Sequence, residues 1–130
     1  NGAELLRLWT AASDYQGDVV FSKTILDQLS ESYRKLRNTC RYLLSNLSDF
    51  VPSRDALPDD KLRELDLLAL GLLRERDHQI RQAYEAYAFH DVVRLMVDYC
   101  ITTSAEYLDP IKDALYCEGA ASPVRRSAQT

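Results

Sequence analysis

A run of apolar residues spaced alternately three and four positions apart is the feature that most constrains the fold of this chain. Its members are Leu26, Leu29, Tyr33, Leu36, Cys40, Leu43 and Leu47. Because an α-helix turns once every 3.6 residues, this spacing places them all on one face. The run therefore predicts a long helix that packs lengthwise against other helices. Ser22 is the expected N-cap, and Pro52 is expected to end the helix near Asp49.

Three further segments carry helical patterns, and short connections separate them. With only four glycines and four prolines, the composition favours helices over a turn-rich β fold. Pro58 predicts a helix start, because proline needs no N–H partner in the first turn. The expected helices span Pro58 to about Tyr87, about Phe89 to Ile101, and a shorter segment, capped by Thr103 or Ser104, that ends near Leu115. The predicted fold class is all-α, an up-and-down helical bundle of about four to five helices.

The two ends of the chain look like cut points within a longer protein. The sequence opens inside an amphipathic pattern at Ala3, with no leader before it, and an extended linker from Asp14 to Phe21 follows. Near the other end, Ser122 and Pro123 form a helix-start signature that comes too late for a helix to be completed. We therefore expect a single helical unit cut from a larger chain.

Charge and cysteine content narrow the class of protein. The net charge is −4, which by itself argues mildly against a nucleic-acid partner, since polyanion binders usually carry a basic excess. No apolar run approaches the roughly 20 residues that a membrane-spanning helix needs. Cys40, Cys100 and Cys117 form no CxxC pair, so we expect neither a disulfide framework nor a zinc site. These features favour a cytoplasmic protein.

No group of residues has the spacing that catalysis requires. The histidines, His78 and His90, lack a metal-ligand or triad neighbour, so we interpret both as structural. No GxxxxGK[ST] or GxGxxG loop is present to hold a phosphate. Two acidic pairs are expected at a helix start and on its exposed face, and they are Asp59 with Asp60 and Glu64 with Asp66. The sequence predicts no catalytic, metal-binding or cofactor-binding residue in this chain.

Residues 33–42 contain four basic residues and no acidic one, in an otherwise acidic chain. At 100° per residue, Arg34, Arg37 and Arg41 lie along one strip of the helix, about 110° from the centre of the apolar face. We call these three arginines the basic strip. Guanidinium groups spaced one helical turn apart suit the phosphates of a nucleic-acid backbone. The candidate RNA-binding residues are Arg34, Lys35, Arg37, Asn38, Arg41 and Tyr42.

The expected roles within this set differ. Lys35 adds charge, Asn38 suits a sugar or base edge, and Tyr42 is a better stacking candidate than Tyr33, which lies in the apolar seam. The alternative is a solvated face, with arginines paired to acids such as Glu31, on a helical protein-interaction or structural bundle. The periodicity taken alone favours that alternative, so both hypotheses stay open at this point.

Several ordered motifs resemble those of one enzyme family. Residues 2–9 (GAELLRLW), 14–15 (DY) and 17–18 (GD) resemble the segment after the KMSKS loop in class I synthetases for branched aliphatic amino acids. Residues 33–39 (YRKLRNT), 41–44 (RYLL) and 46–50 (NLSDF) are similar to the first long helix of their anticodon domain. The motifs that resemble the isoleucine enzymes in particular are 89–90 (FH), 107–109 (YLD), 112–113 (KD), 115–117 (LYC) and 125–126 (RR), with Thr130. Nearly the whole chain is thus similar to part of the isoleucyl-tRNA synthetases.

This resemblance implies a module that binds tRNA without performing the chemistry. The whole enzyme of that family uses ATP and magnesium to attach isoleucine to tRNA, and it hydrolyses mischarged tRNA in a separate domain. For this chain, the resemblance implies that residues 1–21 are a connecting helix and linker on the side of the catalytic domain. Residues 22–130 would be the anticodon-binding bundle, truncated at its C-terminus. The implied partners are the anticodon arm of an isoleucine-specific tRNA and the catalytic domain of the parent chain, with no membrane.

Overall fold

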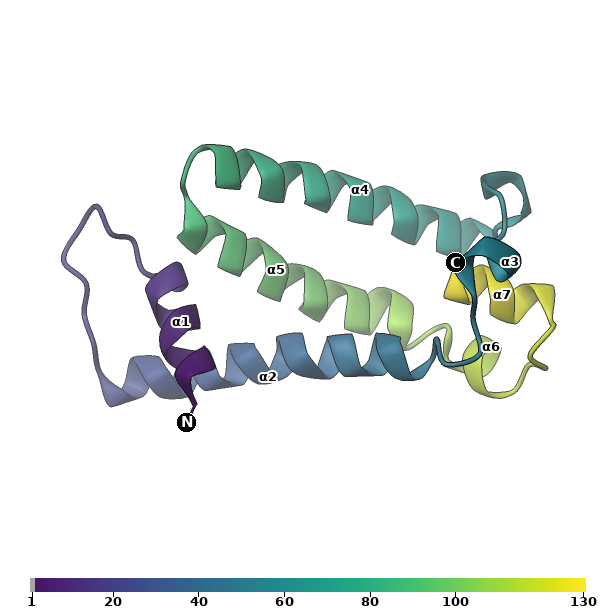
Figure 1. Cartoon of the computed structure of the whole chain (residues 1–130), viewed down its shortest axis with the longest axis horizontal. Helices are drawn as coiled ribbons and strands as arrows, with labels where there is room; N and C mark the ends of the chain where they lie inside the picture. The colour runs from purple at the N-terminus through teal and green to yellow at the C-terminus, as the bar shows by residue number, and fades with distance from the viewer. Residues whose placement is uncertain (1) are drawn as a thin grey trace. The chain divides into compact units, whose positions relative to one another are not determined.

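Helices are the regular secondary structure of the computed structural model, which describes residues 2–130 (Figure 1), and the predicted all-α class is confirmed. The chain divides into two compact units. The first contains the residues up to Asn38 together with Glu75–Ile101, and the second contains Thr39–Arg74 and Thr102–Thr130. The helices are α1 (Ala3–Ala12), α2 (Lys23–Ser45), α3 (Pro52–Asp55), α4 (Glu64–Glu85), α5 (Phe89–Thr103), α6 (Lys112–Tyr116) and α7 (Pro123–Gln129).

The first unit holds α1, the first part of α2, the last part of α4 and most of α5. The Ser22 hydroxyl accepts a hydrogen bond from the Ile25 N–H at 3.2 Å, so the predicted N-cap of α2 is confirmed. The rings of Trp9 and Phe21 meet edge-on, with centroids 5.1 Å apart, and this contact ties α1 to the linker before α2. Figure 1 shows α5 returning alongside the last part of α4 after a tight turn.

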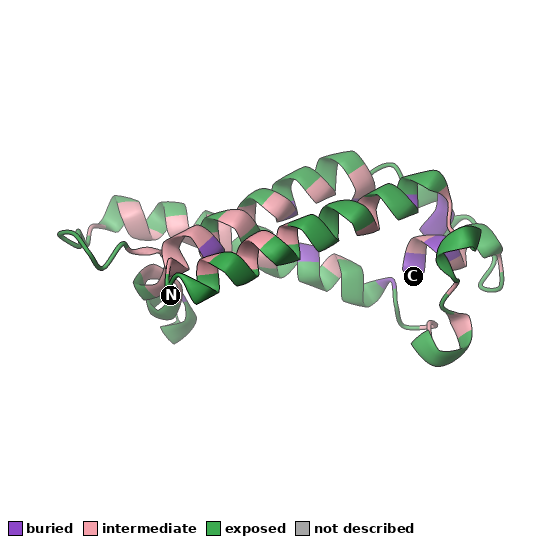
Figure 2. Ribbon diagram, turned by 90° about the horizontal axis from the view of Figure 1, so that it is seen from above, coloured by how far each residue is buried: buried purple, intermediate pink, exposed green. Residues whose placement is uncertain are grey.

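The second unit contains a small apolar core built from its shorter helices. Leu108, Ile111 and Leu115 are buried against one another, and Tyr42, Tyr107 and Ala128 pack against them. Figure 2 colours the buried residues purple, and several of them gather near the C-terminus, on α6 and α7. The end of α2 is therefore held by segments that lie more than sixty positions further along the chain.

Side chains and tertiary contacts move two predicted helix boundaries. The α2 helix ends at Ser45, before the expected stop near Asp49, because the Ser45 hydroxyl and the Asn46 amide both donate to the Tyr42 carbonyl. The next helix begins at Glu64 instead of Pro58, which precedes a 3₁₀ turn at Asp59–Lys61. Its start is fixed from outside, since the Ser127 hydroxyl accepts the Arg63 N–H at 2.9 Å.

The expected new helix capped by Thr103 or Ser104 is wrong. Thr103 has helical dihedral angles, and α5 continues without a break into a π-helical turn at Ser104–Leu108. The chain then turns around Pro110, which has no N–H to donate, before α6 begins. The prediction that no helix is completed after Ser122 is also wrong, because α7 forms with Pro123 in its first turn.

Tyr87 has a left-handed backbone, with φ of 55°, in the turn between α4 and α5. Its N–H donates to the Tyr84 carbonyl at 3.0 Å, and the Ala88 N–H donates to the Ala83 carbonyl at 2.9 Å, which closes the end of α4. Glycine is the usual residue there, because a Cβ atom disfavours this conformation. The Tyr87 ring packs edge-on against Phe89, with centroids 6.1 Å apart.

We predict that a Tyr87→Gly variant is more stable than a Tyr87→Ala variant by about 1 kcal/mol. Both variants lose the ring, so the difference isolates the cost of a Cβ atom at this backbone angle. Urea unfolding followed by circular dichroism measures it. At Gln82, inside α4, the same pair should differ in the opposite direction, because glycine weakens a helix interior. Equal midpoints for the two Tyr87 variants would show that the left-handed turn is absent in solution.

Candidate nucleic-acid interface

Four of the predicted RNA-binding residues lie on the part of α2 that belongs to the first unit, and all four are exposed. They are Arg34, Lys35, Arg37 and Asn38. The Arg34 guanidinium lies 2.6 Å from a carboxylate oxygen of Glu31, so this arginine makes the ion pair that a solvated face would make. Within residues 2–130, Lys35 and Arg37 form no ion pair, and their charges face solvent uncompensated.

Arg41 lies on the part of α2 that belongs to the second unit. It is exposed, and it likewise forms no ion pair within the described residues. The lack of an ion pair at Arg41 follows from the sequence of α2, which has no acidic residue after Glu31. A salt bridge within a helix needs an acid three or four positions away, and none stands at that spacing from Arg41.

The exposed arginines elsewhere are largely compensated by carboxylates. Arg54 lies 2.8 Å from Asp55, Arg81 lies 2.8 Å from Asp77, and Arg94 lies 2.9 Å from Asp91. Such exposed pairs add at most about 1 kcal/mol to stability, but they reduce the positive charge offered to a polyanion. The cations without an ion pair in the described chain are Arg7, Lys23, Lys35, Arg37, Arg41, Lys61 and Arg76. Lys35, Arg37 and Arg41 are the ones that follow closely along one helix.

Tyr42, the predicted stacking residue, is half-buried and packs against the core of the second unit. Its ring packs against the core of Leu108, Ile111 and Leu115, and its hydroxyl donates to the Leu108 carbonyl at 3.3 Å. Burial, followed by a hydrogen bond with Tyr116, raises the pKa of Tyr42 to about 12. Sequence periodicity could not predict this packing, because Tyr42 lies off the apolar seam. The core that it contacts is formed by residues more than sixty positions further along the chain.

Asp66 is buried, so its predicted position on an exposed helix face is wrong. Only 2% of it is accessible, and four donated hydrogen bonds satisfy its carboxylate. Arg63 donates from Nε at 2.7 Å and from an Nη atom at 2.9 Å, the Ser127 hydroxyl at 2.6 Å, and the Tyr107 hydroxyl at 2.9 Å. Burial would raise the pKa of Asp66, but these donors outweigh it and hold that pKa below its usual value. The group has the character of a structural ion pair and offers no open catalytic carboxylate.

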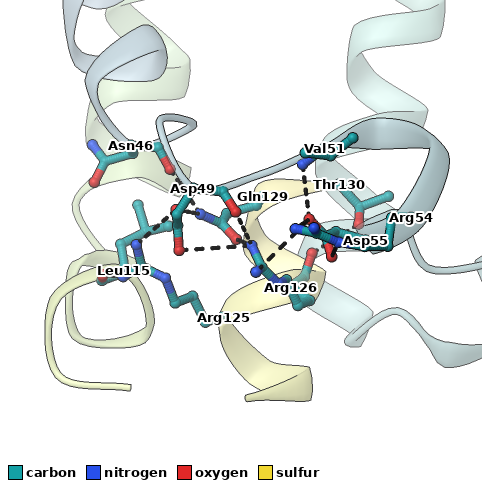
Figure 3. Close-up of polar contacts among 10 residues, drawn as sticks. All are labelled: Asn46, Asp49, Val51, Arg54, Asp55, Leu115, Arg125, Arg126, Gln129 and Thr130. Carbon is teal, nitrogen blue, oxygen red and sulfur yellow. Dashed lines mark hydrogen bonds and ion pairs between the residues drawn. The ribbon is translucent and has the colours of Figure 1, made fainter. Parts of the chain in front are cut away.

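A second polar network joins α7 to the segment after α2 (Figure 3). Gln129 donates from its amide to the Asn46 carbonyl at 2.8 Å and to the Asp49 carboxylate at 2.9 Å. Arg125 donates to Asp49 at 3.1 Å and to the carbonyl of Leu115. Hydrogen bonds from Arg125 and Gln129 hold the pKa of Asp49 below its usual range.

Arg126 completes this network from the other side of α7. Its guanidinium donates to the Asp49 carbonyl at 3.1 Å, lies 3.8 Å from the Asp55 carboxylate, and sits over the Phe50 ring. Only 17% of the Arg125 side chain and 13% of the Arg126 side chain are exposed, so neither is offered to an external phosphate. Sequence reasoning missed this network, because its acids and bases lie more than seventy positions apart.

The histidines and cysteines do not come together as a metal site. Among residues 2–130, no three histidine, cysteine or acidic side chains are grouped closely enough to hold a metal ion. His78 lies 3.0 Å from the Gln82 amide, and His90 lies 3.7 Å from the Asp91 carboxylate. In the same part of the chain, no helix combines the length and the apolar character that crossing a membrane requires.

Comparison with known proteins gives one family. Residues 66–130 match the family described as the anticodon-binding domain of tRNA ligase. Over 130 residues, 99% of this chain, it is 50% identical to the isoleucine–tRNA ligase of Syntrophotalea carbinolica and 51% identical to that of Desulforudis audaxviator. The corresponding identity to the Thermotoga maritima enzyme is 50%. The chain spans 14% of the length of each of these relatives. The basic strip lies before the part matched by the family, but inside the part aligned with the relatives.

We predict that Asp66→Ala lowers the free energy of unfolding by about 3–5 kcal/mol, since it leaves the Arg63 guanidinium without its partner. Asp77→Ala, which breaks an exposed pair with Arg81, should cost less than about 1 kcal/mol. Urea unfolding at neutral pH compares the two variants. Equal losses would contradict the structural weight assigned to the Asp66 network.

The same carboxylate predicts a dependence of stability on pH. The folded protein lowers the pKa of Asp66, so the stabilisation is complete above the usual aspartate pKa of about 4 and is lost as pH falls through the lower, folded pKa. The difference in unfolding free energy between wild type and Asp66→Asn should therefore shrink as the pH falls below about 4. Urea titrations of both proteins between neutral and acidic pH measure it, and a constant difference would contradict the assignment.

Proposed function

Because this chain belongs to the anticodon-binding domains of tRNA ligases, we propose that it binds the anticodon arm of a tRNA, with α2 contacting the phosphates. The observation that carries this proposal is the run of uncompensated cations, Lys35, Arg37 and Arg41, on one helix of an acidic chain. Each guanidinium presents a planar fork of donors that fits a phosphate, and Lys35 adds a point charge beside them.

Three members of the predicted set take more limited or different roles in this proposal. Arg34 is a phosphate contact that first gives up its ion pair with Glu31, and both partners are more than 60% exposed, so that exchange costs little. Asn38 is exposed beside the strip and offers an amide to a ribose or a base edge. Tyr42 is assigned to the packing of α2, because its ring and hydroxyl are engaged.

For the parent protein, we propose the activity that the names of the relatives carry, ligation of isoleucine to its tRNA. ATP and magnesium would act there in a catalytic domain outside this chain, in the cytoplasm. Residues 1–21 would be the connecting helix and linker toward that domain, and residues 22–130 the anticodon-binding bundle. The contribution of this chain to catalysis is positional, because docking the anticodon arm decides where the acceptor end of the tRNA arrives.

A helical protein-interaction bundle is the second candidate function. The Arg34–Glu31 ion pair is the feature that it predicts, and that pair is present. It does not account for the absence of acids at the spacing that would neutralise Arg41 on α2. The two functions differ in salt dependence and in the partner bound, so one binding experiment separates them.

We predict that Arg37→Ala and Arg41→Ala each weaken tRNA binding about tenfold at low salt, and that each lowers the slope of log affinity against log salt by about 1. Fluorescence anisotropy with an isoleucine-accepting tRNA transcript measures both quantities. Arg81→Ala is the matched control, since Arg81 is exposed but paired with Asp77, and it should bind like wild type. Circular dichroism checks that each variant remains helical. Wild-type affinity and salt slope in both strip variants would overturn the proposed contacts.

A further inference from the structure

Gln129, near the end of α7, carries a buried amide that bonds the segment directly after α2. Only 6% of this residue is exposed. Its Nε2 donates to the Asn46 carbonyl at 2.8 Å and to the Asp49 carboxylate at 2.9 Å, and its Oε1 accepts from Arg126 at 2.8 Å (Figure 3). A glutamine amide has two N–H donors, so both are satisfied. A buried amide that is bonded in this way has one favourable orientation, and it fixes the groups that it bonds.

The Asn46 carbonyl connects this amide to the last turn of α2. Asn46 is the first residue after the helix, and 9% of it is exposed. Its backbone N–H and its side-chain amide both donate to the Tyr42 carbonyl, at 3.3 Å and 2.9 Å. Tyr42 follows Arg41 directly in the chain. A series of hydrogen bonds therefore runs from Gln129 through Asn46 to the helical turn that carries Arg41.

Apolar packing gives the last turn of α2 little further support. Leu43 is 42% exposed and Leu44 is 71% exposed, so neither residue anchors the turn in a core. Tyr42 is one anchor, since its ring packs against the core of the second unit. The bond from Gln129 to the Asn46 carbonyl is a second anchor. Without it, the end of the helix should fray, because the last carbonyls of a helix have no partner within the helix.

We propose that Gln129 is a positioning residue of the RNA-binding surface, which holds the last turn of α2 so that Arg41 meets a phosphate. The inference rests on the proposed function, and it adds a residue that does not itself touch the RNA. A guanidinium binds a phosphate through two parallel hydrogen bonds in a narrow geometry, so a displaced helix end weakens the contact although the arginine is still present. Arg37 belongs to the first unit, so its contact should not depend on Gln129.

The test compares Gln129 with Ser127, a buried polar residue on the same helix. Gln129→Met keeps the length of the side chain and removes both donors. Ser127→Ala is the matched control, because the Ser127 hydroxyl bonds Arg63 and Asp66, near the start of α4. Circular dichroism checks that each variant remains helical. If Gln129→Met does not fold, Gln129→Ala replaces it, since the smaller side chain leaves room for water at the Asn46 carbonyl.

Fluorescence anisotropy with an isoleucine-accepting tRNA transcript measures each change alone and combined with Arg41→Ala or Arg37→Ala. We expect Gln129→Met to weaken binding roughly fivefold, less than the about tenfold loss in Arg41→Ala, because the contact is displaced and not deleted. Two changes that act through one contact do not add, so Gln129→Met should have no further effect on Arg41→Ala. Combined with Arg37→Ala, it should still weaken binding roughly fivefold.

Salt dependence gives a second readout. The slope of log affinity against log salt should fall in Gln129→Met, because a phosphate contact is weakened. Ser127→Ala should keep the affinity and the slope of wild type. A change in the stability of the second unit alone would not lower the slope.

The outcomes separate the inference from the proposed function. A loss in Gln129→Met that vanishes with Arg41→Ala and persists with Arg37→Ala supports the positioning role. Equal losses in Gln129→Met and Ser127→Ala, or a loss that persists with Arg41→Ala, overturn the inference. Normal binding by Gln129→Met while Arg41→Ala weakens binding overturns the inference and leaves the proposed function standing. Wild-type affinity in both Arg37→Ala and Arg41→Ala overturns the proposed contacts, and the inference with them.

Discussion

The hydrogen bonds to the buried Asp66 carboxylate are the interactions on which the second unit most depends. An isolated charge in that position would be strongly destabilised, and the fold tolerates it because four donated hydrogen bonds replace its water. The donors come from Arg63 just before α4, from Tyr107 in the π-helical turn and from Ser127 on α7. A single charge thus fixes three segments whose apolar contacts alone would hold them loosely, since the core beside them is small.

Contacts within the second unit hold the end of α2, which carries Arg41. The Tyr42 hydroxyl joins the end of α2 to the Leu108 carbonyl by a hydrogen bond. The Gln129 amide donates to the carbonyl of Asn46, the first residue after α2. Arg125 forms an ion pair with Asp49, and Arg126 forms one with Asp55. From the sequence alone, these two arginines would count as candidate phosphate contacts. Because their side chains are largely buried, we assign them a structural role.

The sequence predicted those features of the fold that depend on interactions between residues close together in the chain. The cap at Ser22 and the apolar spacing from Leu26 onward involve residues within one or two helical turns, so α2 and the all-α class could be derived from the sequence. The predicted seam is wrong beyond Leu36, because Cys40, Leu43 and Leu47 are exposed while Thr39 and Asn46 are buried. The start of α4 could not be derived from the sequence, because Ser127 sets it from more than sixty positions away. The new helix expected from Thr103 onward is absent, because α5 continues directly into a π-helical turn that ends at Leu108.

The residues of the candidate site also differ in how far the sequence alone could predict their positions. Exposure of Arg34, Lys35, Arg37 and Asn38 agrees with their angle to the first part of the apolar seam. Around Arg41 the seam does not mark the buried face, because Cys40 and Leu43 are exposed there. The packing of Tyr42 against the core could not be predicted from the seam, because it depends on which distant segment packs on α2. A pattern within α2 alone could not show that Tyr42 packs against Leu108, Ile111 and Leu115, because these residues lie far along the chain.

The distribution of charge explains how an acidic chain can offer a surface to a polyanion. Acids stand near many of the exposed arginines outside α2 and reduce the positive charge there, as Asp55, Asp77 and Asp91 do. On α2 they stop at Glu31, so positive potential is concentrated on one helix while the net charge of −4 disfavours binding elsewhere. Under the proposed function, the net negative charge would contribute to selectivity, because it would weaken nonspecific contact of RNA with the acid-rich parts of the chain.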